Sequence, residues 1–145
     1  MIAYADTGFV VTLYKAESTS ARAAAIMAKQ KHSVCLSMLA EIEFINALHL
    51  AVFRKEISSP DAILKRRLFA EDVDNGIFTI MPVSPTALHA KTIELADRHS
   101  ASTGTRSLDL MHVAAAVSLK TREFFSFDAR QRKVAKSEGL TVRPS

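Results

Sequence analysis

The order of apolar and polar positions along the chain predicts strands that alternate with helices. Short apolar runs are typical of buried strands, and they occur at 2–5, 33–37, 77–83, 123–127 and 140–142. The segments between them combine strong helix formers with apolar residues at three- and four-residue steps. They predict helices at 9–14, 18–31, 38–54, 60–74, 84–99, 108–120 and 128–139. This alternation indicates an α/β fold with a mostly parallel sheet and helices on both faces.

Local signals refine the ends and faces of these helices. Ser59 precedes Pro60 and is predicted to cap the following helix, and Ser84 begins the next helix in the same way. The small, polar segment at 100–107 contains a glycine and is predicted to be a loop. In the helix at 38–54, residues at the helical step form one face that we expect to be buried: Met38, Ile42, Ile45, Leu48 and Val52.

Length and composition narrow the class of protein. The 145 residues suffice for an ordinary core, and we expect a single domain over 1–145. No apolar run approaches the roughly 20 residues that span a bilayer, and Asp6 interrupts the first apolar run, so we expect a cytoplasmic protein without a membrane segment. The single cysteine, Cys35, lies in a predicted strand and is expected to be buried. A net charge of +4 and a pI near 9.4 permit a polyanionic partner such as nucleic acid.

Two acids follow predicted strands, at the edge where parallel sheets bind their ligands. Asp6 ends the first strand, and Asp128 follows the strand at 123–127. Each also has a simpler explanation, because an aspartate there can cap the next helix or form a turn. The triplet Asp6-Thr7-Gly8 also occurs in aspartic proteases, but their almost entirely β framework does not fit the predicted helices.

Two further acids lie on predicted helices. Asp109 stands in a first helical turn, where the helix dipole favours any acid, and the preceding loop and following alanines place it near the sheet edge. Glu43 stands among apolar residues, where an unpaired buried carboxylate would be costly. Glu41 is the alternative inward acid, but Glu43 shares a helical stripe with Leu39 and Asn46, which favours Glu43.

Several carboxylates at one edge would repel one another unless a cation neutralised them. A set of oxygen ligands without histidine or cysteine suits Mg²⁺ or Mn²⁺. Such a site performs phosphoryl chemistry, in which one metal ion activates a water and a second can stabilise the leaving oxygen. The acids therefore indicate metal-dependent phosphoryl chemistry.

Four segments, in this order and at this spacing, resemble a known family. They read YADTGFV, SMLAEIEFINAL, SLDLMHVAAAVSL and FFSFDARQRKVAKSEGLTV. The chain from Met1 to about Val142 resembles PIN-domain proteins, and its length is similar to that of the VapC-type toxin ribonucleases of bacterial type II toxin–antitoxin pairs.

The resemblance implies a three-layer α/β/α fold with four to five strands and an acidic site for Mg²⁺ or Mn²⁺. Asp6, Glu43, Asp109 and Asp128 match the acids that hold the metal, and Thr7 matches the hydroxyl residue that follows the first acid. Thr7 either forms the turn or positions a metal-bound water or a phosphate. Gly8 departs from the family, which more often has a second small hydroxyl residue there, so a secondary contact is in doubt.

The activity implied is that of an endoribonuclease that leaves a 5′-phosphate and a 3′-hydroxyl. The implied partners are an RNA substrate, a cognate antitoxin protein and a second copy of the chain in a homodimer. The alternative is a PIN-like module that has lost turnover and binds RNA or protein.

Other candidate residues have weaker claims. His112 lies one turn after Asp109, but a histidine among apolar helical residues is interpreted as structural rather than as a general base. Arg106 precedes Asp109 in the predicted loop and could contact an RNA phosphate. One basic stretch is interpreted as a solvated helix face, with phosphate contact as the alternative: Arg130, Arg132, Lys133 and Lys136.

Overall fold

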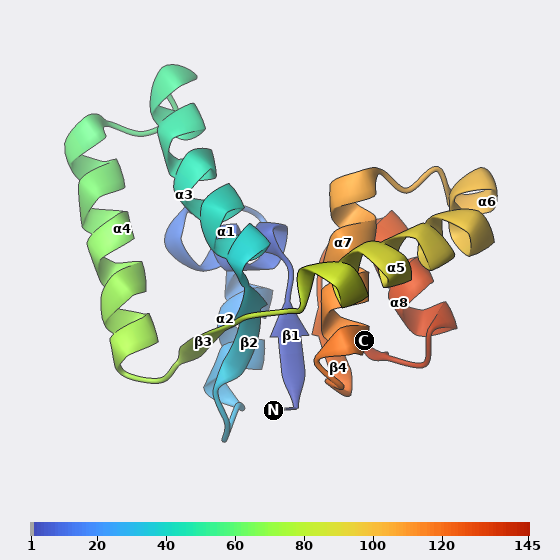
Figure 1. Ribbon diagram of the computed structural model, residues 1–145. Coiled ribbons are helices and arrows are strands. Elements are labelled where there is room, and N and C mark those ends of the chain that lie inside the picture. Colours follow the sequence, from blue (N-terminus) through green and yellow to red (C-terminus); the bar gives the residue numbers. More distant parts are fainter. Residues whose placement is uncertain (1) are drawn as a thin grey trace.

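Parallel strands form a central sheet in the computed structural model, which describes residues 2–145 (Figure 1). The strands are β1 (Ala3–Ala5), β2 (Val34–Ser37), β3 (Phe78–Met81), β4 (Glu123–Phe125) and β5 (Thr141–Arg143). Their order in the sheet is β3-β2-β1-β4-β5, and every neighbouring pair is parallel. The predicted mostly parallel sheet of four to five strands is confirmed.

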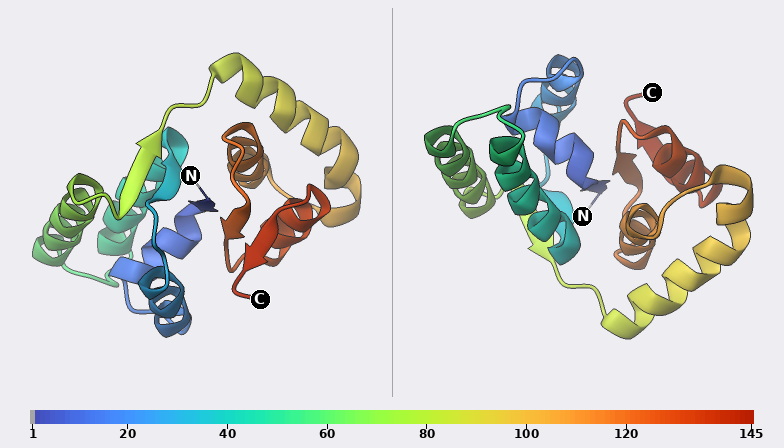
Figure 2. Two further views of the ribbon diagram at one scale, coloured as in Figure 1. Left: turned by 90° about the horizontal axis from the view of Figure 1, so that it is seen from below. Right: turned by 90° about the horizontal axis from the view of Figure 1, so that it is seen from above.

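Helices cover both faces of the sheet (Figure 2). One face carries α1 (Thr7–Tyr14), α2 (Ser20–Ala28), α3 (Met38–Phe53) and α4 (Ser59–Asp74). The other carries α5 (Pro85–Leu95), α7 (Ser107–Ser118) and α8 (Ala129–Ser137), with the short segments η1 (Ala96–Ser100) and α6 (Ala101–Thr103) between α5 and α7. The fold is therefore the predicted three-layer α/β/α arrangement.

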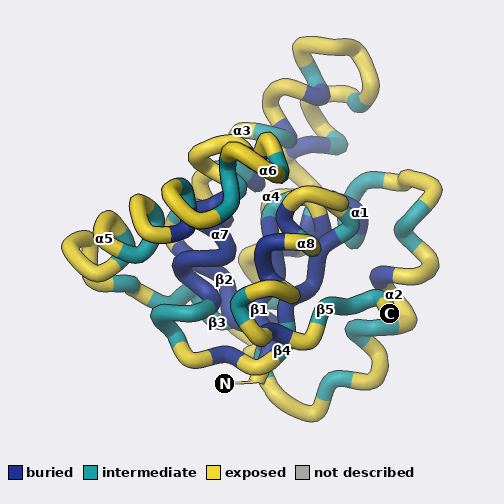
Figure 3. The backbone as a smooth tube through the Cα atoms, turned by 90° about the vertical axis from the view of Figure 1, so that its right-hand side faces the viewer, coloured by how far each residue is buried: buried dark blue, intermediate teal, exposed yellow. Residues whose placement is uncertain are grey.

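Alternating side chains of β1 divide the core into two clusters. Ala3 and Ala5 belong to the cluster beneath α1 and α3, whereas Tyr4 belongs to the cluster beneath α7. This is the alternation expected of a strand that is covered on both faces. The helix α7 is buried along most of its length, whereas α5 lies outside it and is largely exposed (Figure 3). Cys35 is buried, as predicted.

The strand order places a topological switch point beside β1. From β1 the chain continues to β2 and β3 on one side of the sheet, and later to β4 and β5 on the other. In open parallel sheets, ligands bind beyond the carboxyl ends of the strands at such a point. Asp6 follows β1 directly, and Asp128 stands three positions after Phe125, where β4 ends. Both acids therefore lie at this edge.

The predicted buried face of α3 is partly wrong. Met38 is 58% exposed and Ile42 is 66% exposed. The residues that α3 buries are Ala40, Phe44, Leu48 and Ala51. Apolar residues occur on more than one face of this helix, and the ring of Phe44, which packs against Tyr14 and Phe69, lies on the buried side.

The predicted loop at 100–107 is also partly wrong. The helical backbone continues through η1 and α6 to Thr103, and only Gly104, Thr105 and Arg106 separate it from α7. The hydroxyls of Ser102 and Thr103 donate to the carbonyl of His99, so these small polar residues satisfy the helix instead of breaking it. Gly104 has a φ of +65°, a left-handed conformation that glycine adopts without strain, and this ends the helix.

Helix capping departs from the prediction by one position in α4. Ser58, rather than Ser59, caps the helix by accepting the N–H of Asp61 at 3.2 Å. Ser84 caps α5 as predicted. In the described part of the chain, no helix combines the length and the apolar character that a membrane crossing requires.

Candidate active site

The acids singled out in the sequence line one hollow of about 450 Å³ at the carboxyl ends of the strands. They come from four different elements of the fold: Asp6 after β1, Glu43 on α3, Asp109 on α7 and Asp128 before α8. Thr7 lines the same hollow. Residues more than 100 positions apart in the chain are thus brought to one place by the sheet order.

Asp6 serves two structural purposes at once. It is only 1% exposed, and its Oδ1 accepts a hydrogen bond from the N–H of Phe9 at 2.7 Å, which caps α1. Its Oδ2 accepts a hydrogen bond from the hydroxyl of Ser126. Burial raises the pKa of Asp6 to about 6, although the bonds from Ser126 and Phe9 oppose this shift. The capping interpretation therefore holds, and the carboxylate still borders the hollow.

Glu43 is held by two neighbours. The hydroxyl of Thr7 donates to its Oε1 at 2.9 Å, and Nε2 of His112 lies 2.6 Å from the same oxygen. Burial raises the pKa of Glu43, but the hydrogen bonds from His112 and Thr7 outweigh burial and hold it below its usual range. Glu43 lines the hollow whereas Glu41 does not, in agreement with the predicted phase of these two acids.

Asp109 and Asp128 are linked through Gln131. Asp128 caps α8 by accepting the N–H of Gln131 at 2.8 Å, and Nε2 of Gln131 donates to Oδ1 of Asp109 at 3.0 Å. Burial, together with the charge of Asp128, raises the pKa of Asp109. Burial, the largest cause of the raised pKa of both Asp6 and Asp109, thus disfavours the charged forms of these two carboxyls, and the charge of Asp128 adds to the effect.

Arginines surround the acids but differ in their contacts. Arg106 is 83% exposed at its side chain, with Nε 3.7 Å from Oδ2 of Asp109. It lines an adjoining hollow of about 650 Å³ that shares Glu43 and Asp109 with the first. The interpretation of Arg132 as part of a solvated face is wrong, because its guanidinium donates to the carbonyls of Ser126 and Pro144.

The basic stretch on α8 is otherwise exposed. Lys133, Lys136 and Arg130 are all exposed. Arg130 also donates to the carbonyl of Gly104 at 3.2 Å. Arg130 thereby ties α8 to the short loop that carries Arg106.

The sequence model of the PIN domain family matches residues 3–137 of the chain. The chain belongs to the PIN domain family. The match extends from β1 through α8 and includes the four acids of the hollow that the sequence analysis singled out. No protein of curated function matches this PIN domain in sequence.

Solved structures of similar fold cover nearly the whole PIN domain. VapC20 of Mycobacterium tuberculosis, described as a sarcin-ricin loop cleaving toxin, has a TM-score of 0.71 at 17% identity, over 98% of this chain and 99% of that one. VapBC2 of Rickettsia felis, bound to a promoter DNA fragment, has a TM-score of 0.68 at 14% identity, over 99% of this chain and 98% of that one. A toxin–antitoxin complex from Klebsiella pneumoniae has a TM-score of 0.62 at 12% identity, over 89% of this chain and 88% of that one. At these identities the likeness is one of fold.

The donors of the hollow fit a hard divalent cation that keeps part of its water shell. Among residues 2–145, no three histidine, cysteine, aspartate or glutamate side chains are grouped so that they could hold a metal ion. Mg²⁺ commonly takes one or two carboxylates directly and completes its shell with water. Oε1 of Gln131 is a buried oxygen without a hydrogen-bond partner in the described part of the chain. It is available to accept a hydrogen bond from such a water.

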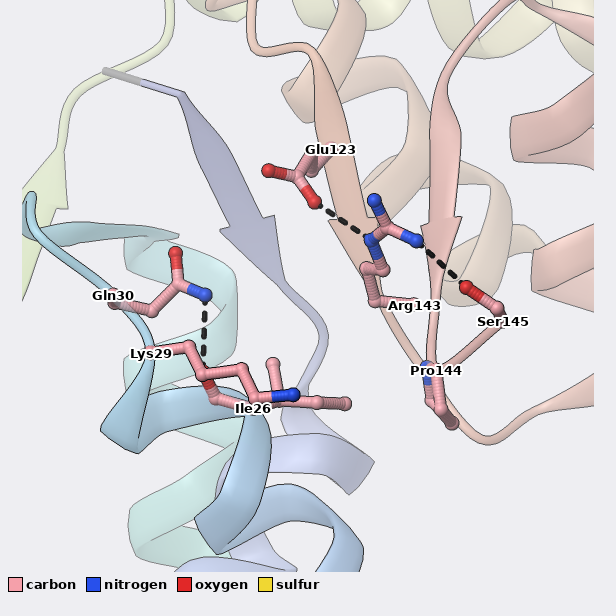
Figure 4. A pocket seen from close by; sticks show the side chains of 7 residues that line it. All are labelled: Ile26, Lys29, Gln30, Glu123, Arg143, Pro144 and Ser145. Atoms are coloured by element: carbon pink, nitrogen blue, oxygen red, sulfur yellow. Dashed lines mark hydrogen bonds and ion pairs between the residues drawn. The ribbon is translucent and has the colours of Figure 1, made fainter.

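Another hollow, of about 490 Å³, lies between α2 and the edge formed by β4 and β5 (Figure 4). Its one carboxylate, Glu123, accepts a hydrogen bond from Nε of Arg143 at 3.0 Å. A single neutralised acid does not make a cation site, so the acidic hollow is the stronger candidate for metal chemistry.

Sequence reasoning missed several polar residues of the site. Gln131 was not singled out, although it stands three positions after the capping Asp128. Ser126, at the end of an apolar run, donates to Asp6. His112 is buried, as its structural interpretation requires, but its ring also contacts Glu43. Only the three-dimensional arrangement reveals these contacts, because each joins residues from different elements.

Proposed function

We propose that this PIN domain is a metal-dependent endoribonuclease and the toxin of a toxin–antitoxin pair. The observation that carries the proposal is the convergence of Asp6, Glu43, Asp109 and Asp128 on one hollow at the switch point of the sheet. Each acid comes from a different element, and two of them have raised pKa values. Such a cluster is costly without a cation, which supports a catalytic purpose.

In this proposal the four acids bind hydrated Mg²⁺ or Mn²⁺, one or two of them directly and the others through its waters. The bound metal would supply an activated water for in-line attack on a phosphodiester and charge stabilisation for the leaving oxygen, so that the products carry a 5′-phosphate and a 3′-hydroxyl. Asp6 and Asp109 would supply negative charge to the ion, although burial raises the pKa of both carboxyls. Thr7 orients Glu43 through its hydroxyl, and Oε1 of Gln131, which has no partner in the described part of the chain, would accept a hydrogen bond from a water of the ion.

RNA is the proposed substrate class. Arg106 projects an exposed guanidinium beside Asp109 and would contact a phosphate of the strand in the adjoining hollow. The net charge of +4 favours a polyanion in general. VapC20 of M. tuberculosis, similar in fold, is described as a sarcin-ricin loop cleaving toxin, which supports the proposal.

Protein partners are also proposed: a cognate antitoxin, and a second copy of the chain in a homodimer, all in the cytoplasm. Two exposed apolar regions support them. Met38 and Ile42 are exposed one turn apart on α3, and the exposed Leu108 on α7 lines the hollow beside Glu43 and Asp109. Phe53 and Ile63 are exposed on α3 and α4. Exposed apolar side chains of this kind mark protein interfaces when they are contiguous.

The proposal is tested with purified protein and a set of labelled structured RNAs. We expect cleavage with added Mg²⁺ or Mn²⁺, no cleavage after dialysis into excess EDTA, and recovery when the metal is restored. The new ends should be 5′-phosphates, which a phosphate-dependent 5′ exonuclease detects. Asp128→Asn is the matched loss-of-charge variant, and Asp74→Asn, at the exposed end of α4, is its control.

Two results would count against the proposal. Cleavage that persists undiminished in EDTA would contradict the metal mechanism. Binding of RNA or antitoxin without any cleavage, with Mg²⁺ or Mn²⁺ present, would instead support the alternative of a binding module that has lost turnover.

A further inference from the structure

A tyrosine hydroxyl is buried in the central strand, directly behind the acidic hollow. Tyr4 is fully buried, and its ring stacks on Phe124 with centroids 5.8 Å apart. Its hydroxyl lies 2.8 Å from Oγ of Ser37 and 2.7 Å from Nδ1 of His112. Burial raises the pKa of Tyr4 well above its ordinary value, so the hydroxyl keeps its proton. Because Tyr4 does not itself line the hollow, any effect on the site must pass through these neighbours.

The direction of each hydrogen bond in this series follows from Glu43, the carboxylate at one end of the series. An ionised Glu43 can only accept, so Nε2 of His112 must donate to its Oε1, across 2.6 Å. A neutral imidazole with its proton on Nε2 has a bare Nδ1, which accepts from the hydroxyl of Tyr4.

The same logic continues to β2. With its own proton committed to His112, the oxygen of Tyr4 is free to accept from Ser37. Oγ of Ser37 in turn accepts the N–H of Ala40 at 3.1 Å, as the cap of α3. Every group in the series Ser37, Tyr4, His112 and Glu43 is thus satisfied by one arrangement of protons.

The consequence for Glu43 is a fixed orientation. Its Oε1 accepts from both His112 and Thr7, at 2.6 Å and 2.9 Å, whereas no protein donor contacts Oε2 in the described part of the chain. The side chain of Glu43 is 28% exposed and lines the hollow. A carboxylate held by one oxygen presents the other to a cation or its water, as outer partners do for metal ligands elsewhere.

We propose that Tyr4 and His112 are positioning residues: Tyr4 holds His112 in the Nε2-protonated tautomer, and His112, with Thr7, holds Oε1 of Glu43 so that Oε2 faces the metal site. The inference rests on the proposed function, in which Glu43 serves a metal. It assigns His112 a role through Glu43, and not that of a general base.

The first experiment reads the tautomer directly, without metal or RNA. ¹⁵N NMR of the imidazole nitrogens, at about pH 8 where imidazole is ordinarily neutral, separates a protonated from a bare nitrogen. His112→Gln identifies the His112 signals among the five histidines. We expect wild-type His112 to carry its proton on Nε2 and to lose this preference in Tyr4→Phe. Tyr14→Phe is the matched control, because it removes another tyrosine hydroxyl, bonded to Asp72, away from the hollow.

The second experiment measures Mn²⁺ affinity by titration calorimetry and then the kinetics of RNA cleavage. Tyr4→Phe should weaken Mn²⁺ binding roughly tenfold, as is typical for outer partners of metal ligands. It should lower kcat by a similar factor while KM for RNA stays within about twofold. His112→Gln should retain most of the Mn²⁺ affinity, because its amide nitrogen reaches the position of Nε2, whereas the shorter His112→Asn should lose it. Thermal melts confirm that each variant is folded.

The inference is overturned if wild-type His112 carries its proton on Nδ1, or if Tyr4→Phe and His112→Asn bind Mn²⁺ as tightly as the wild type. It is also overturned if His112→Gln and His112→Asn lose Mn²⁺ affinity equally. Wild-type protein that shows the expected tautomer and binds Mn²⁺ but cuts no RNA would contradict the proposed nuclease activity alone. The two failures are therefore distinguishable.

Discussion

Gln131 donates a hydrogen bond from Nε2 to Oδ1 of Asp109 at 3.0 Å, while its own Oε1 is buried without a partner in the described part of the chain. A buried, unpaired amide oxygen costs stability, so its position next to an acidic cluster suggests a ligand that pairs with it. We expect Gln131→Met, which keeps the side-chain length but removes both polar atoms, to weaken Mg²⁺ affinity roughly tenfold. Calorimetric titration of the purified variant measures this.

The matched control for this variant is Gln30→Met. Gln30 lines the hollow of Figure 4, away from the acids, where its Nε2 donates to the carbonyl of Ile26 at 3.0 Å. Mg²⁺ affinity should be unchanged in Gln30→Met. Equal affinity in both variants would show that Gln131 has only a structural purpose.

The raised pKa of Asp6 predicts that Asp6→Asn increases the free energy of unfolding by an amount that depends on pH. Burial raises this pKa to about 6, so the folded protein holds a proton that the unfolded chain has lost between about pH 4 and pH 6. The stability from the protonated carboxyl is present below about pH 4 and is lost as the pH rises through about 6. Asparagine caps a helix about as well as aspartate and carries no charge. Relative to the wild type, the variant should therefore become more stable with rising pH, by about 2 kcal/mol between pH 4 and pH 7.5.

Thermal melts in EDTA at several pH values test this expectation. Asp74→Asn removes one exposed charge at the end of α4 and corrects for the change in net charge. A stability difference between Asp6→Asn and the wild type that does not vary with pH would mean that the pKa of Asp6 is not raised in the folded protein.

The sequence determines the fold more completely than it determines the site. Short apolar runs separated by helical periodicity leave few arrangements other than a parallel sheet with helices on both faces. The phase of α3 was less certain, because Met38, Ile42 and Phe44 are all apolar and only packing against Tyr14 and Phe69 selects the buried one. The small polar residues before Gly104 also led to a wrong prediction of where the preceding helix ends.

At the site, the acids were predictable but their supporting contacts were not. Asp6 and Asp128 follow apolar strands, and the carboxyl ends of parallel strands meet at one edge, so their proximity follows from the topology. The bonds from Tyr4 to His112, and from Gln131 to Asp109, join residues on different elements whose side-chain directions depend on packing. No periodicity in the sequence encodes such contacts.

Asp109→Asn should separate function from stability. The oxygen of asparagine can still accept the hydrogen bond from Gln131, and loss of the charge relieves repulsion from Asp128, which contributes to the raised pKa of Asp109. The metal-free variant should therefore melt at the same temperature as the wild type or slightly higher. Mg²⁺ should stabilise the wild type by mass action and leave the variant unchanged.

Thermal melts of both proteins, each with EDTA and with Mg²⁺, give the four melting temperatures needed for this comparison. A large loss of stability in metal-free Asp109→Asn would favour a purely structural role for this acid in the first turn of α7. Stabilisation of the variant by Mg²⁺ to the same extent as the wild type would remove Asp109 from the metal site.

Glu43→Gln and Glu41→Gln should differ sharply, because two positions on a helix are about 200° apart and cannot face one edge together. Glu43 lines the hollow and accepts hydrogen bonds from Thr7 and His112, whereas Glu41 does neither. We expect Glu43→Gln to lower RNA cleavage by about a hundredfold or more and to relieve toxicity in cells, and Glu41→Gln to be nearly neutral. The two variants must be compared at equal protein levels, since a toxin that fails to accumulate would mimic an inactive one. If Glu41→Gln were silent and Glu43→Gln remained active, the role of Glu43 would be wrong, while the assignments of Asp6, Asp109 and Asp128 would stand on their own tests.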